Sequence, residues 1–109
     1  MAVRLSKPWM ATEEALARLR GNLGVFELAD ADGNVQFIGY AGGDSLYGLK
    51  GCVTAALQTV GGVSLVRFEV TTAYFTRYRE LLMAYHADFA ALPPGNPPLT
   101  FKLGKLSPA

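Results

Sequence analysis

The chain has 109 residues, of which 50% are apolar, and a formal net charge of +1. This length and composition predict one domain with a single core, and one cysteine with one histidine exclude a disulfide framework and a tetrahedral Cys/His zinc site within one chain. The small charge excludes a large basic field for polyanions, and no apolar stretch could span a bilayer, so we expect a cytoplasmic protein that contacts no membrane.

The first segment, residues 1–21, is predicted to be a helical extension of the domain. Pro8 disfavours helical angles at the residue before it, so a helix must begin later in the chain. The hydroxyl of Thr12 followed by two glutamates is typical of a helix start, and Gly21 predicts the helix end. We therefore expect one short helix here.

A β-hairpin is predicted next. Two runs rich in β-forming residues, 24–29 and 35–41, flank a turn that contains Asp-Gly. The strands should be adjacent and antiparallel, with Phe26 on one and Phe37 on the other. Because side chains alternate along a strand, Tyr40 should lie on the opposite face of the sheet from Phe37.

A second helix follows, with apolar residues at helical spacing over 46–60 and Asp44 or Ser45 as its N-cap. Gly48 and Gly51 lie inside this pattern. Because an interior glycine weakens a helix, the pair indicates that a backbone or a ligand approaches closely. The glycine-rich run resembles a phosphate-binding P-loop, but its lysine is one place late, so we interpret it as a helix entry packed against the sheet.

The last predicted elements are a strand over 64–71 and a helix over 73–89. Polar and apolar residues alternate in the strand, which favours a sheet covered on one face only. The helix should bury an apolar stripe formed by Tyr74, Tyr78, Leu81, Leu82, Tyr85 and Phe89. A proline-rich turn over 92–98 ends the helix, and 99–103 predicts a short edge strand.

Two tripeptides carry a resemblance to a known family. Gly24 and Phe26 bound the run Gly-Val-Phe, and after ten residues Phe37 and Gly39 bound the run Phe-Ile-Gly. Their spacing around a hairpin turn resembles the signature of the GIY-YIG nuclease superfamily.

The order of the later elements extends this resemblance from about residue 23 to 98. A helix, a third strand, a long helix containing 79–83 and a turn with Asn96 follow in the family's succession. The resemblance implies an α+β fold, with a small three-stranded antiparallel sheet flanked by helices. On this interpretation the chain is one domain whose core is 22–98, and 99–109 is a tail or an edge strand.

The resemblance also implies a chemistry for named positions. In active members a signature tyrosine helps to generate the nucleophile, a helix arginine stabilises phosphate charge and a later glutamate holds a divalent metal. Here Phe26 and Phe37 stand at both tyrosine positions, and Lys50 is the cation nearest to the arginine position. Glu80 corresponds to the metal ligand, for Mg²⁺ or Mn²⁺, and Asn96 to a late asparagine of the family.

Two functions remain open. Because losing a positioned acid or base typically lowers a rate about 10²- to 10⁴-fold, the favoured hypothesis is a catalytically impaired module that binds nucleic acid, such as DNA, or protein, and needs no cofactor. The alternative is a metal-dependent endonuclease with a rearranged site, in which a tyrosine is a displaced phenol, the lysine faces phosphate and Glu80 holds the metal. The residues of that site are Tyr40, Tyr47, Lys50, Glu80 and Asn96. An ion pair with Arg77, three residues earlier on the helix, is the plain structural interpretation of Glu80.

Overall fold

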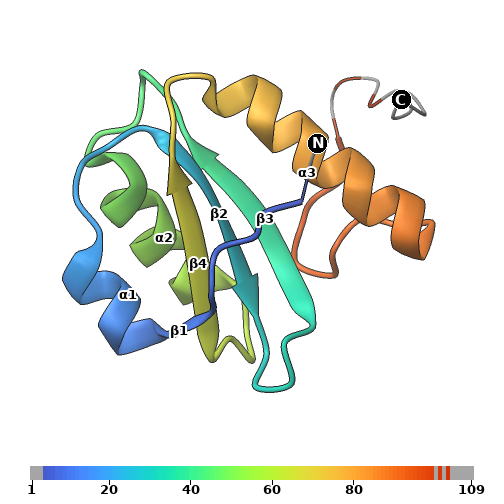
Figure 1. Cartoon of the computed structure of the whole chain (residues 1–109), viewed down its shortest axis with the longest axis horizontal. Helices are drawn as coiled ribbons and strands as arrows, with labels where there is room; N and C mark the ends of the chain where they lie inside the picture. Colours follow the sequence, from blue (N-terminus) through green and yellow to red (C-terminus); the bar gives the residue numbers. More distant parts are fainter. Residues whose placement is uncertain (1–3, 100, 102, 104–109) are drawn as a thin grey trace.

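The computed structural model describes residues 4–99, 101 and 103. It has an α+β fold in which a four-stranded antiparallel sheet lies between α1 and α2 on one face and α3 on the other (Figure 1). The elements are β1 (Met10–Ala11), α1 (Thr12–Arg18), β2 (Gly24–Ala29), β3 (Val35–Ala41), α2 (Gly48–Thr59), β4 (Leu65–Val70) and α3 (Tyr74–Phe89). No helix in this described part of the chain is long and apolar enough to cross a membrane.

The strand order is β1-β4-β2-β3, and all neighbours are antiparallel. The predicted hairpin is confirmed, because β2 pairs with β3 and places Phe26 opposite Gly39. The predicted three-stranded sheet is wrong by one strand: Met10 of β1 pairs with Val66 of β4. A strand of two residues is too short to show a periodicity in the sequence. It exists only because it contacts β4.

The first face of the sheet is covered by α1 and α2 and is apolar. Phe26, Leu28 and Val66 of the sheet pack against Leu49 and Val53 of α2. All five are buried, and Ala15 of α1 and Leu19, which follows that helix, are further buried residues of the same cluster. This cluster is the larger part of the hydrophobic core.

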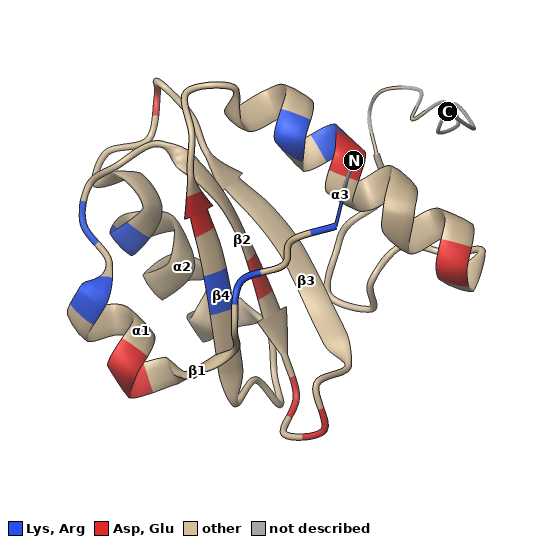
Figure 2. Cartoon of the chain, viewed as in Figure 1, with Lys and Arg blue, Asp and Glu red and all other residues tan. Residues whose placement is uncertain are grey.

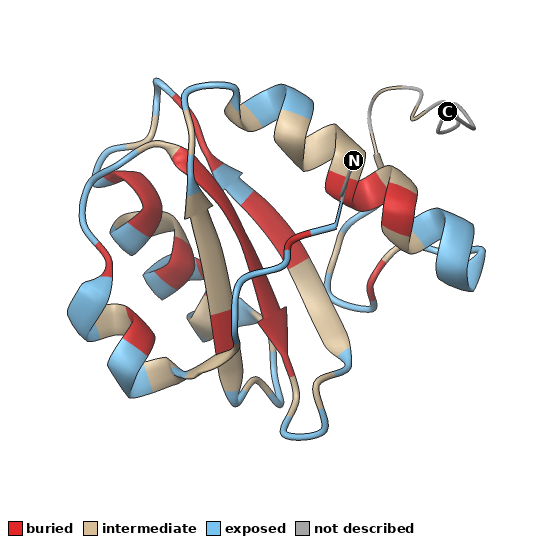
Figure 3. Cartoon of the chain, in the orientation of Figure 1, coloured by how far each residue is buried: buried red, intermediate tan, exposed pale blue. Residues whose placement is uncertain are grey.

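The second face of the sheet is covered by α3 and by the N-terminal segment, so the prediction of a sheet covered on one face is wrong. Ile38 of β3 lies in a cluster with Leu81 and Leu82 of α3 and with Leu5. The predicted burial of Leu82 is confirmed, with 0% of the residue exposed, whereas the predicted burial of Phe89 is wrong, since this residue is 63% exposed. The C-terminal end of α3 extends past the sheet, as its exposed surface shows (Figure 3).

The helix starts differ from the expected caps. Thr12 lies in the first turn of α1, and Ala11 occupies the N-cap position. In α2 the N-cap position belongs to Tyr47, with no side-chain cap bond, so neither Asp44 nor Ser45 caps the helix. The first turn of α2 instead donates to main-chain carbonyls of the loop that follows α1.

The C-terminal segment returns along the sheet. Ala90 adopts a left-handed conformation with φ of 57°, and it ends α3. The predicted edge strand over 99–103 falls partly outside the described residues, since 100 and 102 are not described. Leu99, Phe101 and Leu103 pack against the cluster beneath α3.

Candidate functional site

The two signature positions hold aromatic rings that pack against each other. The ring centroids of Phe26 and Phe37 are 5.9 Å apart, and Phe26 is only 2% exposed. A Cβ atom at Gly39 would lie within 2.8 Å of the Phe37 ring and would also overlap the Phe26 ring. Glycine at this position therefore lets the rings fill the space, and neither ring carries a hydroxyl for proton transfer.

An open apolar hollow of about 410 Å³ lies over this ring pair, between α2 and the proline-rich turn. Its walls include Phe37, Cys52, Ala55 and Pro97, and no charged side chain among the described residues lines it. The hollow therefore offers a phosphate group no cation.

Asn96 and Tyr40 both line the same hollow. The amide of Asn96 accepts a hydrogen bond from the Ile38 N–H at 2.9 Å and donates one to the Ile38 carbonyl at 2.9 Å. Beside it, the Gly95 N–H donates to the Gln36 carbonyl at 2.7 Å. The turn thus acts as a partner for the edge strand β3, and the Asn96 amide is occupied by main-chain groups.

The Tyr40 side chain belongs to an aromatic cluster with the start of α3. Its ring stacks on Tyr74 at 5.9 Å, meets Phe75 edge-on at 5.6 Å and lies 4.7 Å from Tyr78. Burial raises the pKa of Tyr78, and the neighbouring Tyr40 adds to this rise. As expected from alternation, Tyr40 lies on the opposite face of the sheet from the two phenylalanines.

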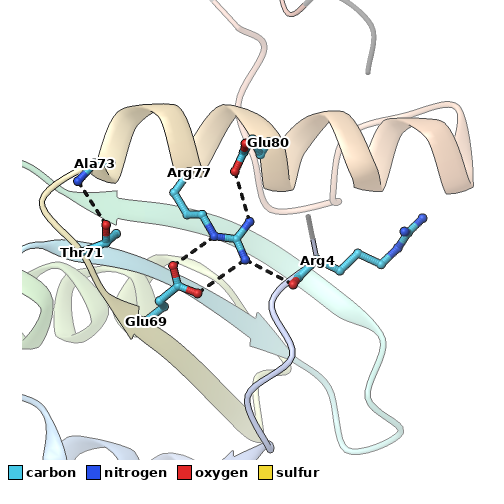
Figure 4. Close-up of polar contacts among 6 residues, drawn as sticks. All are labelled: Arg4, Glu69, Thr71, Ala73, Arg77 and Glu80. Atoms are coloured by element: carbon cyan, nitrogen blue, oxygen red, sulfur yellow. Dashed lines mark hydrogen bonds and ion pairs between the residues drawn. The ribbon is translucent and has the colours of Figure 1, made fainter. Parts of the chain in front are cut away.

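Glu80 lies in a different part of the molecule, beside Arg77 (Figure 4). The Arg77 guanidinium approaches the Glu80 carboxylate at 3.5 Å and the Glu69 carboxylate at 3.0 Å, and it also donates to the Arg4 carbonyl at 3.2 Å. A divalent cation would have to displace this guanidinium or tolerate its repulsion. These residues do not fit the metal that the GIY-YIG resemblance implies.

A second ion pair lies on the same face and was not predicted. Arg67 of β4 contacts Glu27 of β2 at 2.7 Å, and the Trp9 ring covers the guanidinium with 4.0 Å to its centroid. Burial raises the pKa of Glu27, and the attraction of Arg67 opposes this rise. Figure 2 shows charged residues on both β2 and β4. The sequence did contain a signal for this ion pair: a glutamate stands inside an apolar run, and an arginine faces it across the sheet.

The largest of the hollows that we describe, about 840 Å³ and open, lies between the end of α1 and the start of α2. It brings Lys50 and Tyr47 together with Arg20, which the sequence did not single out. Leu46 and Tyr47 are 83% and 69% exposed. Of the described residues, two cations and no carboxylate line this hollow, so it is the hollow best suited to an anionic group.

Glycines shape this hollow, as the pattern predicted. Gly48 has φ of 59°, and a Cβ atom there would overlap the Gly21 carbonyl, so the loop after α1 can press on α2. A Cβ atom at Gly51 would lie 2.8 Å from that of Tyr47. This run is a helix entry, as interpreted, and Leu49 packs against the sheet. Its glycine Gly48, however, lies against the loop after α1, where the N–H of Lys50 donates to the Arg20 carbonyl at 3.0 Å.

The five residues proposed for a rearranged nuclease site thus lie in three places. Tyr40 and Asn96 line the apolar hollow, Tyr47 and Lys50 line the cationic hollow, and Glu80 lies in the ion-pair cluster of Arg77.

Comparison with known proteins gives a family but no function. No curated protein and no solved structure matches the chain. The model of one family, described as a domain of unknown function, DUF7508, matches residues 3–88. The chain therefore belongs to the DUF7508 family.

Proposed function

We propose that this chain is a GIY-YIG-like domain that does not cleave phosphodiester bonds and serves as a binding module for nucleic acid or protein. The observation that carries the proposal is the ring pair of Phe26 and Phe37 at the two signature positions. A phenyl ring can neither accept nor donate the proton that a phenol would transfer, and the described residues that line the hollow above the pair carry no charge.

The positions of the other candidate groups support the same proposal. Phosphodiester hydrolysis needs a metal, a cation and a proton-transfer group around one phosphate. Glu80 is engaged by Arg77, and it lies in neither the apolar hollow nor the hollow that contains Lys50. No arrangement of the described residues as they stand brings these groups to one reacting atom.

The test is a cleavage assay on the purified full chain. We expect no cleavage of single-stranded, double-stranded or branched DNA, or of RNA, above a buffer control with Mg²⁺ or Mn²⁺. The variant Glu80→Ala should give the same result as the natural sequence, and Glu13→Ala, a matched change at an exposed glutamate of α1, serves as its control.

Cleavage by the natural sequence that disappears in Glu80→Ala, and not in Glu13→Ala, would overturn the proposal in favour of a metal-dependent endonuclease. Activity that is equal in all three proteins would indicate a contaminating nuclease, and repurification should then remove it. The binding part of the proposal is tested by the ligand experiment of the next subsection.

A further inference from the structure

We propose that the hollow between α1 and α2 binds an acidic peptide segment of a partner protein, with an apolar side chain of that segment on Leu46 and Tyr47. This inference rests on the proposed binding function and names its ligand. It is carried by two cations and an exposed apolar pair around one hollow of about 840 Å³.

The cations are available to a ligand. Lys50 is exposed, and its ammonium group makes no ion pair with any described residue. Arg20 uses one nitrogen, Nη1, to hold the Ala17 and Leu19 carbonyls at 3.0 Å, which fixes the guanidinium at the end of α1. Within the described residues, the N–H groups on Nε and Nη2 have no acceptor, so a carboxylate can approach them.

The hollow also has an apolar part that is exposed to a ligand. Leu46 and Tyr47 are adjacent in the chain and both are largely exposed, while Leu19 and Ala55 contribute to the walls. Gly51 lets the base of the Tyr47 side chain lie close against α2. Aromatic and aliphatic side chains at the edge of a hollow are typical anchors of protein interfaces.

The charge distribution favours a short acidic segment over a nucleic acid strand. Nucleic-acid affinity grows with the number of phosphates that a cationic surface neutralises. Within the described part of the chain only two cations line the hollow, and the nearby Arg18 is paired with Glu14 at 3.1 Å. The whole chain has a net charge of +1. One or two carboxylates match this pair of cations, whereas a polyanion would meet no continuous basic path.

The N-terminus of α2 is not the source of the expected affinity. The N–H groups of Leu49 and Lys50 donate to the Asn22 and Arg20 carbonyls at 2.8 and 3.0 Å. Because these donors are occupied, the side chains of Lys50 and Arg20 are the groups expected to hold the anion, and substitution of either should weaken binding.

The experiment is a selection from a random peptide library displayed on phage, with the full chain as bait. We expect enrichment of peptides that combine aspartate or glutamate with a leucine or an aromatic residue. The most enriched peptide is then titrated into ¹⁵N-labelled protein, and we expect the largest chemical-shift changes at Gly21, Tyr47 and Lys50.

Two variants test the residues of the hollow. Lys50→Glu should weaken binding of the peptide about tenfold by adding repulsion, and Leu46→Ser should also weaken it.

Arg18→Glu is the matched control, because it reverses a charge on α1 at a residue that does not line the hollow. Its affinity for the peptide should equal that of the natural sequence. Circular dichroism of each variant checks that the fold is intact, and Lys50 is exposed, so its substitution should not disturb packing.

Enrichment of basic or uncharged peptides, no enrichment, or shift changes centred elsewhere would overturn the inference. A single-stranded oligothymidylate is titrated in the same way, to test whether the hollow binds nucleic acid instead of a peptide. If it binds at the hollow and no acidic peptide does, the peptide ligand is wrong while the proposed binding function stands. Cleavage of nucleic acid dependent on Glu80 would instead contradict the proposed function itself.

Discussion

The two faces of the sheet share the same strands, but they hold their covering elements in different ways. On the α1–α2 face the strands present Phe26, Leu28 and other apolar side chains to a buried cluster. On the α3 face the same strands carry Glu27 and Arg67, and the N-terminal segment crosses over this pair and the second pair beside it.

This difference supports the proposal that the chain does not cleave nucleic acid despite its signature-like tripeptides. The signature positions belong to the apolar face, where Phe26 and Phe37 are packed, while Glu80 belongs to the ionic face, where Arg77 holds it. Both sets of positions occur in the order that the resemblance implies, but each set contributes to the packing of its own face.

The largest expected effect concerns the buried ion pair. Arg67→Ala leaves the Glu27 carboxylate, whose side chain is 7% exposed, without its partner, and should lower the free energy of unfolding by about 3–5 kcal/mol. The matched change Arg18→Ala, in a pair whose side chains are 65% and 49% exposed, should cost less than about 1 kcal/mol. Urea unfolding of both variants at neutral pH measures the contrast. Equal losses would mean that the two faces do not differ as described.

The loss in Arg67→Ala should also depend on pH. Burial already raises the pKa of Glu27, and removing Arg67 removes the attraction that opposes the rise. The folded variant then binds a proton that the unfolded chain releases, so its stability falls as pH rises from the unfolded pKa to the raised folded pKa. The deficit should therefore be smallest in acid, where Glu27 is protonated in both states. A deficit that is constant with pH would contradict this.

A second prediction compares two residues of α3. Leu82→Ala removes a side chain of a residue that is 0% exposed and should destabilise the chain by about 2–5 kcal/mol. Phe89 is 63% exposed, so Phe89→Ala should cost less than about 1 kcal/mol, although its ring contacts Tyr85. The midpoints of urea unfolding report both values. A larger loss of stability for Phe89→Ala than for Leu82→Ala would contradict the assignment of Leu82 to the buried face of this helix.

These two residues show what the sequence could predict and what it could not. Helical spacing assigns Leu82 and Phe89 to one stripe, but spacing cannot tell where the sheet beneath the helix ends. The hairpin followed from alternation and an Asp-Gly turn, whereas β1 is only Met10 and Ala11 and depends on β4. Local patterns therefore gave most elements, and tertiary contacts decided their limits.

The candidate sites show the same division between what local patterns predict and what tertiary contacts decide. Glycines in the second helix correctly indicated a close approach: at Gly48 the approaching group is the backbone around Gly21, and at Gly51 it is the Tyr47 side chain. Arg20 was missed because it follows a helix with no motif around it, and it meets Lys50 only when the loop after α1 packs on α2.

A smaller effect is expected at the edge of the sheet. Asn96→Ala leaves the N–H and carbonyl of Ile38, a buried residue, without the amide that now bonds both, and should cost about 1–3 kcal/mol. The Ile38 amide should also exchange its hydrogen faster. Asn22→Ala, at an exposed residue, is the control and should leave that exchange unchanged. Unaltered exchange in Asn96→Ala would show that the turn does not cover β3.

The most direct measurement of the division between the two faces is a titration of ¹⁵N-labelled protein with Mn²⁺, whose unpaired electrons broaden nearby amide signals. Because Arg77 lies between the carboxylates of Glu80 and Glu69, we predict that broadening near Glu80 is no stronger than near the exposed Glu13 and does not saturate at low Mn²⁺. Saturable broadening centred on Glu80 and abolished in Glu80→Ala would contradict the account, because it would place a metal centre where the structure has an ion pair.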